Sequence, residues 1–144
     1  MSLQLFVTLV ATLAPDEAGT KQEMEKFQGT WSVASVEVDG KPIREKLRKQ
    51  LTMTFAGNKY TLKIGDDVVV EGTFKLDPSK NPKTIDEAET SGPNKGSVSL
   101  GIYKWDGDDL TICFGANNDK NRPTKFSSER GTKHELVSLK RAKP

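Results

Sequence analysis

Residues 27–40 of the chain, FQGTWSVASVEVDG, carry the pattern that decides the fold. The stretch starts with a glycine stop at Gly29, passes through Trp31 into a long apolar run, and ends in an Asp-Gly pair. An apolar run rich in valine between two such breaks is typical of a β-strand. We therefore interpret it as the first strand of a small antiparallel barrel.

The hydrophobic pattern of this strand changes phase along its length. Trp31 and Val33 share one face, because successive side chains of a strand point to opposite faces. Ala34, Val36 and Val38 continue the apolar pattern with the opposite parity. A phase change of this kind predicts a β-bulge, which bends a strand at a barrel corner. The alternative is a strand buried on both faces, and the sequence leaves both interpretations open.

Length and composition indicate one domain without a metal or a cofactor. The chain has 144 residues and a formal net charge of +2, which provides no general attraction to nucleic acid, so no nucleic-acid partner is expected. Cys113 is the single cysteine and His134 the single histidine. One cysteine excludes an intramolecular disulfide, and so few soft ligands exclude a zinc site of clustered His and Cys within one chain.

The N-terminal residues 3–14, LQLFVTLVATLA, are almost entirely apolar. The run is too short to span a bilayer as a helix, so no transmembrane segment is predicted. It resembles the apolar region of a secretory leader, although no basic residue precedes it, and this predicts an extracytoplasmic (periplasmic or secreted) protein. The alternative is a terminal strand or helix packed on the domain. We assign residues 1–19 to a leader remnant with a linker, and residues 20–144 to a single β-barrel domain.

A short helix is predicted over residues 20–28, just before the first strand. Thr20 and Glu23 have the spacing of a capping box, in which each side chain accepts a hydrogen bond from a free amide at the helix start. The glycine that follows ends the helix. Met24 and Phe27 lie three residues apart and share one face. We expect these two side chains to plug one end of the barrel.

A second helix is predicted over residues 42–50, PIREKLRKQ, because proline is well tolerated at the first helical position. Ile43 and Leu47 form an apolar stripe, and most of the other side chains are basic. Placed between the first two strands, this helix would lie across a barrel mouth. Arg44 and Arg48 would then attract an acidic ligand toward the opening.

Alternation of apolar and polar residues dominates the chain from residue 51 onward. The pattern predicts an all-β fold, an antiparallel up-and-down barrel of about eight strands. A sandwich bent nearly into a barrel would fit the same pattern. The weakest strand is residues 82–90, PKTIDEAET, in which Ile85 is the only large apolar residue. Polar loops are predicted at residues 91–96 and 115–131.

The short helix, the Gly-Thr-Trp motif at residues 29–31 and a basic residue closing the last strand resemble the calycin superfamily, which includes the lipocalins. The resemblance implies that Trp31 packs at the closed end of the barrel with a basic side chain over its ring. Val137 and Leu139 share a parity with Arg141, so Arg141 is the candidate for this contact. A guanidinium over an indole contributes about 1 kcal/mol.

A closer resemblance, to a lipocalin-like domain family abundant in planctomycete bacteria, covers nearly all of residues 25–142. The matching stretches are residues 27–31 (FQGTW), 38–41 (VDGK), 59–61 (KYT), 72–78 (GTFKLDP), 101–103 (GIY), 110–113 (LTIC), 122–124 (RPT) and 126–128 (FSS). The resemblance implies a lipocalin-like barrel and, because many members carry secretory leaders, an extracytoplasmic location. It implies no particular activity. The sequence departs from the family at residues 86–89, DEAE, where a more apolar strand is expected.

No catalytic constellation is present in the sequence, which lacks a nucleophile elbow, a phosphate-binding loop and a dinucleotide fingerprint. We therefore expect a protein that is not an enzyme. A small barrel can hold one small ligand. The candidate ligand-binding side chains point into the predicted interior or stand at its mouth: Phe55, Tyr60, Phe74, Tyr103, Trp105, Arg44 and Arg48.

Two functions are compatible with these patterns. The first is binding of a small hydrophobic or amphipathic ligand inside the barrel. The alternative is a structural or protein-interaction domain whose barrel is filled by its own side chains and whose protein partner binds the 115–131 loop, because long surface loops are often functional. Phe126 in that loop would either contact the partner or fold back and cap the barrel.

Overall fold

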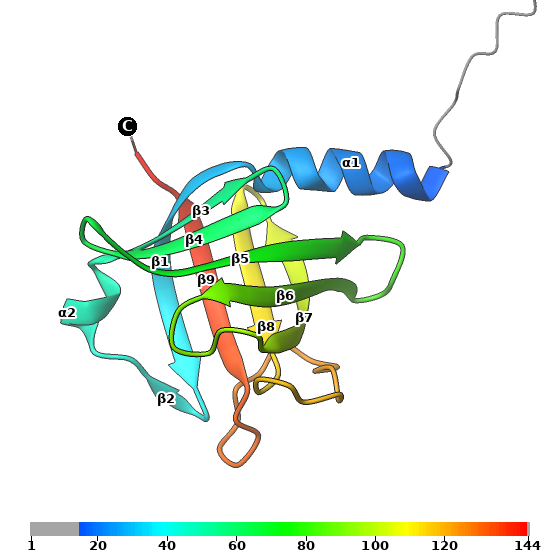
Figure 1. Cartoon of the computed structure of the whole chain (residues 1–144). Coiled ribbons are helices and arrows are strands. Elements are labelled where there is room, and N and C mark those ends of the chain that lie inside the picture. The colour runs from blue at the N-terminus through cyan, green and yellow to red at the C-terminus, as the bar shows by residue number, and fades with distance from the viewer. Residues whose placement is uncertain (1–14, 144) are drawn as a thin grey trace, which may run out of the picture.

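The computed structural model describes residues 15–143 and consists mostly of β-structure (Figure 1). Within these residues, eight antiparallel strands form a closed barrel, accompanied by one additional short strand and two helices. The elements in chain order are α1 (Pro15–Phe27), β1 (Gly29–Val38), β2 (Lys41–Pro42), α2 (Glu45–Arg48), β3 (Leu51–Ala56), β4 (Lys59–Ile64), β5 (Asp67–Asp77), β6 (Lys83–Ser91), β7 (Val98–Asp106), β8 (Asp109–Phe114) and β9 (Glu135–Arg141). The predicted all-β, lipocalin-like barrel is confirmed.

The barrel has the up-and-down topology that the alternating pattern predicts. From β3 to β9 each strand pairs with the next along the chain, β1 pairs with β3, and β1 also pairs with β9. This last pairing closes the sheet, so the barrel wall has no free long edge. The two-residue strand β2 pairs with the end of β1 and lies outside the closed ring.

Strand β1 contains the predicted β-bulge. Its register against β9 shifts between Val33 and Ser35, where one additional residue is accommodated. Val33 and Val36 are therefore both buried although their spacing is not that of a regular strand. The bulge explains the phase change in the sequence, and the alternative of a strand buried on both faces is wrong.

Helix α1 begins at Pro15, earlier than the predicted start at Thr20. Residues 15–19 are thus the first turns of the helix, and their assignment to a linker is wrong. The sequence contains ordinary signals for this earlier start. Proline is favoured at the first helical position, and acidic residues follow it near the positive end of the helix dipole. The leader-like residues 3–14 lie outside the described part of the chain.

Helix α2 is shorter than predicted and spans only Glu45–Arg48. Pro42 belongs to β2 instead of opening the helix. The backbone of Ile43 donates a hydrogen bond to the carbonyl of Val36, which holds this segment in an extended conformation against β1. Tertiary pairing has therefore overridden the local helical preference of residues 42–44.

Strand β6 is complete despite its polar sequence. It pairs with β5 on one side and with β7 on the other, and Ile85 is fully buried. Backbone pairing on both sides compensates for the low strand propensity, since that propensity depends strongly on context. As a result, β6 places acidic side chains on both faces of the barrel wall.

Candidate functional site

One end of the barrel is closed by the last turn of α1 (Figure 1). Phe27 is fully buried, and Met24 packs against the same cluster. The ring centroid of Phe27 lies 5.1 to 5.7 Å from those of four other aromatic rings: Phe55, Phe74, Tyr103 and Trp105. The helix thus contributes a plug that belongs to the barrel core, as the sequence pattern predicts for Met24 and Phe27.

Trp31 and Arg141 attach the end of α1 to the barrel. The indole Nε1 of Trp31 donates a 2.8 Å hydrogen bond to the carbonyl of Phe27. The guanidinium carbon of Arg141 lies 4.1 Å from the centroid of the Trp31 ring, the stacking expected from the resemblance. Arg141 also donates to the carbonyls of Lys26 and Gln28. A positive group at the C-terminus of a helix is favourable because the helix dipole is negative there.

A buried carboxylate, Glu23, completes the closed end. It accepts hydrogen bonds from the Tyr103 hydroxyl (2.8 Å), the Trp105 indole (2.9 Å) and the Lys83 ammonium (3.3 Å). Burial alone would raise the pKa of Glu23, but the hydrogen bonds from Trp105, Tyr103 and Lys83 outweigh it and the pKa is lowered. The charged form of this carboxylate is therefore stabilised, and it connects α1 to strands β6 and β7.

Most of the predicted ligand-binding aromatic residues are packed inside this closed half. Phe55, Tyr60, Phe74 and Tyr103 are buried, and Trp105 is half-buried against them. The Tyr60 ring fills the space beside Gly72, where a Cβ atom would lie only 2.5 Å from the ring. These side chains therefore pack against one another and against α1, which makes them core residues of the closed half.

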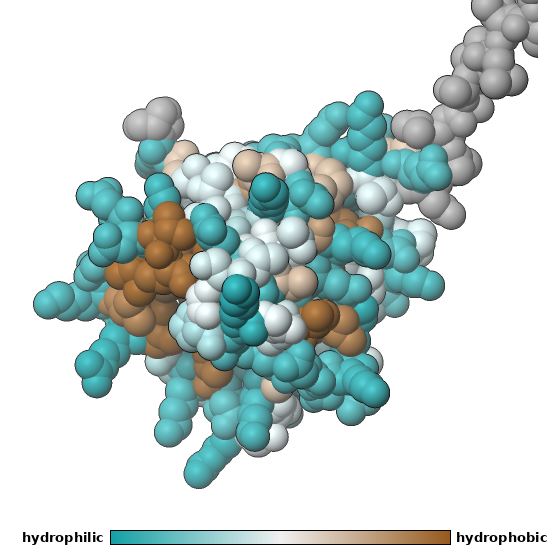
Figure 2. All heavy atoms as spheres, viewed as in Figure 1, coloured by the Kyte–Doolittle hydropathy of each residue, from teal (hydrophilic) through white to brown (hydrophobic). Residues whose placement is uncertain are grey.

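The opposite, open end of the barrel is apolar but less completely buried. Met53 and Leu51 continue the inward-facing row of Phe55 along β3, and Val70 continues that of Phe74 along β5. Leu51, Met53 and Val70 are only half-buried, although all three pack against the core. Figure 2 shows hydrophobic side chains gathered on the side of the molecule where α2 lies in Figure 1. The open half thus presents accessible apolar surface.

Three glutamates lie at inward-facing positions near the open end. Glu87 and Glu89 follow the buried Ile85 along β6 with the spacing of one strand face, and Glu135 precedes Val137 in the same way along β9. Burial, with the nearby carboxylates of Glu135 and Glu89, raises the pKa of Glu87 to about 8. Burial also raises the pKa of Glu135. The charged forms of Glu87 and Glu135 are therefore disfavoured.

The neighbouring carboxyls of β6 differ in their partners. Glu89 accepts a hydrogen bond from the backbone amide of Asn94 in the β6–β7 loop. Asp86 points to the outer face of the barrel, where its Oδ1 lies 2.7 Å from a nitrogen of Arg122. Oε1 of Glu87 is shielded from solvent and has no hydrogen-bond partner among the described residues. A buried polar atom without a partner is uncommon and costly, so it requires an explanation.

The predicted basic residues of the mouth have separate environments. Arg48 is half-buried, donates a 3.2 Å hydrogen bond to the carbonyl of Val33, and lies 3.7 Å from the carboxylate of Glu45. Arg44 is exposed immediately before α2. Arg48 therefore attaches α2 to β1, which is a structural role.

The 115–131 loop covers the outside of the barrel wall. Arg122 donates hydrogen bonds to the carbonyls of Ile85 (3.2 Å) and Gly101 (2.8 Å). The ammonium of Lys104 lies 4.6 Å from the centroid of the Phe126 ring. Since Lys104 faces outward from β7, Phe126 lies outside the barrel, and the expectation that it caps the barrel is wrong.

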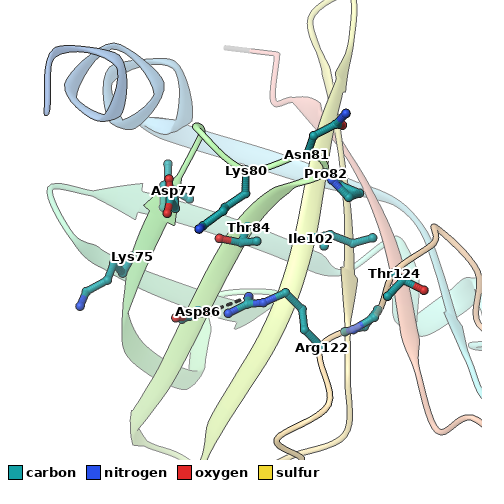
Figure 3. Close-up of a pocket in the computed structure, with 12 residues that line it drawn as sticks. Lys75, Asp77, Lys80, Asn81, Pro82, Thr84, Asp86, Ile102, Arg122 and Thr124 are labelled. Carbon is teal, nitrogen blue, oxygen red and sulfur yellow. Dashed lines mark ion pairs between the residues drawn. The ribbon is translucent and has the colours of Figure 1, made fainter. Parts of the chain in front are cut away.

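A cavity of about 460 Å³ lies on the outer surface beside this loop (Figure 3). Its labelled residues come from β5, the β5–β6 turn, β6, β7 and the loop itself. The Asp86–Arg122 ion pair forms part of its wall. Its lining combines apolar residues with three basic side chains, Lys75, Lys80 and Arg122, and two acidic ones, Asp77 and Asp86.

Sequence reasoning did not identify the three inward-facing glutamates. The signal was present, because Glu87 and Glu89 share the parity of Ile85 in the segment that departs from the resembling family. We interpreted the segment as a weak strand instead of a strand that carries charge into the interior. Glu135 had the same parity as Val137.

No family model, curated protein or solved structure matches the chain. Within residues 15–143, neither helix is long and apolar enough to cross a membrane. Among the same residues, no three side chains of the His, Cys, Asp and Glu types are grouped in a way that could hold a metal ion.

Proposed function

We propose that this domain is a non-enzymatic, extracytoplasmic, lipocalin-like barrel that binds a small amphipathic molecule at its open end. The observation that carries the proposal is the difference between the two halves of the interior. The closed half is packed, whereas the open half combines accessible apolar side chains with a buried carboxyl that has no partner. Ligand sites are typically apolar concavities with a few polar groups that fix orientation.

The proposed ligand places its apolar body against the half-buried residues of the mouth, such as Met53 and Val70, and its polar group near Glu87. This proposed site differs from the one expected from the sequence, which relied on the aromatic residues of the closed half and on Arg44 and Arg48. The extracytoplasmic location rests on the leader-like residues 3–14 and on the resemblance to the lipocalin-like family of planctomycete bacteria.

A second candidate function is protein interaction through the 115–131 loop. The observation that favours it is the outer cavity of about 460 Å³ beside Arg122. The loop is held to the barrel by backbone and side-chain hydrogen bonds, which would give a partner a preformed surface. This candidate requires no ligand inside the barrel.

The decisive experiment is native mass spectrometry of freshly purified protein, followed by extraction of any bound molecule. We expect an adduct that disappears on denaturation. A clean apo mass, together with no binding of a hydrophobic fluorescent dye, would contradict the ligand proposal and favour the interaction candidate.

A matched pair of variants locates the site. Val70→Trp places a large side chain in the open half, and we expect it to abolish dye binding. Val68→Trp is the control, because Val68 lies on the same strand and is 49% exposed. Equal dye binding by both variants would exclude the open end as the binding site.

A further inference from the structure

The buried carboxyl of Glu87 lacks a countercharge in its surroundings. Glu87 pairs with Phe74 on β5 and with Ser99 on β7, neither of which is charged. The hydroxyl of Ser99 donates its hydrogen bond to Asn117 instead. The strands that face Glu87 therefore offer it no cation and no described donor.

The titratable groups nearest to Glu87 are themselves acidic. Glu135 on β9 and Glu89 on β6 both disfavour its ionisation. Tyr60 on β4 is influenced in turn by the same carboxyls, because burial, Glu87 and Glu89 raise its pKa. A group entering this part of the barrel thus meets carboxyls that are disfavoured in their charged form and that a cation would help to ionise.

Three basic side chains that contact the barrel are engaged elsewhere. Lys83 binds Glu23 at the closed end, Arg122 binds Asp86 on the outer face, and Arg48 binds the Val33 carbonyl. An anionic ligand would therefore gain no ion pair from these three cations, and its charge would further disfavour ionisation of Glu87 and Glu135. A cationic ligand would supply the partner that the fold leaves out.

We infer that the polar group recognised by the open end is a basic nitrogen, so that the ligand is an amphipathic amine whose ammonium binds the carboxylate of Glu87 beside Glu135. This inference rests on the proposed function and names its ligand class. Charge-assisted hydrogen bonds between an ammonium and a carboxylate are among the strongest in proteins, and they strengthen where water is excluded. The accessible apolar residues of the mouth would bind the rest of the molecule.

The test compares three probes with the same alkyl chain: octylamine, octanol and octanoate. Isothermal titration calorimetry with the full chain at neutral pH measures each affinity. We expect octylamine to bind about tenfold or more tightly than octanol, and octanoate to bind most weakly. Tight binding of octanol or octanoate relative to octylamine would overturn the inference and leave the proposed function intact.

A variant pair assigns the effect to Glu87. We expect Glu87→Gln to lower octylamine affinity about tenfold while leaving octanol affinity unchanged. Glu71→Gln is the control, because Glu71 is an exposed acid on the adjacent strand β5. If the amine binds the Glu87→Gln variant and the wild type equally, Glu87 is not its partner and the inference is wrong.

Proton release provides an independent readout on the wild-type protein. Glu87 holds a proton at neutral pH, so binding an ammonium there releases it, whereas binding octanol does not. Titrations in two buffers of different ionisation enthalpy measure this proton. Amine binding without proton release would contradict the inference, and failure of all three probes to bind would refute the proposed function itself.

Discussion

The two ends of the barrel handle a buried glutamate in opposite ways. At the closed end, Tyr103, Trp105 and Lys83 all donate hydrogen bonds to Glu23, and its pKa is lowered. At the open end, Glu87 faces other acids and its pKa is raised. A charged glutamate therefore stabilises the fold at the closed end, where it is Glu23. A charged glutamate destabilises the fold at the open end, where it is Glu87.

The difference between Glu23 and Glu87 follows from the helix at each end of the barrel. Helix α1 brings Phe27 into the core and Glu23 into the closed end, where the carboxylate meets three hydrogen-bond donors. The short helix α2 stands beside the open end and leaves Leu47, 40% exposed, at the surface. A protein that maximised stability alone would not leave apolar side chains exposed beside a buried carboxyl that has no partner. Such local sacrifices of stability are typical of functional sites.

The largest predicted effect is loss of the aromatic plug. Phe27→Ala removes a fully buried ring and should lower the free energy of unfolding by about 3–5 kcal/mol. Val70→Ala, at the half-buried open end, should cost about 1 kcal/mol because fewer contacts are lost. Urea unfolding at pH 7 measures both. Equal losses would mean that the two halves are packed alike.

The second effect concerns the closed-end carboxylate. Glu23→Gln should lower the free energy of unfolding by about 2–3 kcal/mol at pH 7, because an amide cannot accept all three donors. The pKa of Glu23 is lowered in the folded state, so its contribution is present above the ordinary carboxyl range and is lost as the pH falls below it.

Unfolding of the Glu23→Gln variant and the wild type should therefore differ at pH 7 and converge in acid. Glu25→Gln provides the control, since Glu25 is exposed on the same helix. A difference that does not depend on pH would show that the carboxylate charge is not what connects α1 to the barrel.

The third effect has the opposite sign. The native state holds the Glu87 proton up to about pH 8, whereas an unfolded chain releases it near pH 4.5. Wild-type stability should therefore fall as the pH rises through this window. At pH 8, Glu87→Gln should be more stable than the wild type by about 1.4 kcal/mol or more, the equivalent of at least one pKa unit.

The measurement is urea unfolding of the Glu87→Gln variant and the wild type at several pH values between about 5 and 8. This range lies between the pKa of Glu87 in the unfolded chain and its pKa in the folded protein. The gain should shrink toward pH 5, and Glu71→Gln should show none. If Glu87→Gln destabilises the protein at pH 8, the Glu87 carboxylate has a stabilising hydrogen-bond or ion-pair partner. The proposed difference between Glu23 and Glu87 would then be wrong.

The smallest effect tests the contact between Arg141 and Trp31. Arg141→Lys retains the charge but loses the planar group that stacks on the indole and donates to two carbonyls, so it should cost about 1 kcal/mol. Lys140→Arg, on the same strand but facing outward, should be neutral. Urea unfolding monitored by tryptophan fluorescence detects both, and a neutral Arg141→Lys would leave charge alone as the stabilising feature.

Much of the fold was predictable from local pattern. Trp31, Val33 and Val36 indicated the bulge, and the alternation after residue 51 indicated the antiparallel strands, because a wall between a core and solvent imposes a period of two. The resemblance to the calycins implied a basic side chain over Trp31, and parity selected Arg141 for it. The start of α1 was misjudged although its proline and acidic residues are ordinary start signals.

The candidate site was less predictable. Phe55, Tyr60 and Phe74 face inward as expected, but a pattern cannot state whether an inward face meets a ligand or the ring of Phe27. Ile102 is 1% exposed although it faces outward, because the 115–131 loop lies over it, and no periodicity reveals such a cover.

The sequence by itself determined which residues alternate, where the strand breaks, and which side chains could share a face, since these properties depend on neighbours in the chain. Only the tertiary structure decided which end of the barrel is closed, and which buried carboxyl has partners. Glu23 and Glu87 are chemically identical, and what separates them is the set of residues that strand pairing brings within hydrogen-bond distance. Partners that are distant in sequence become neighbours only when the barrel closes.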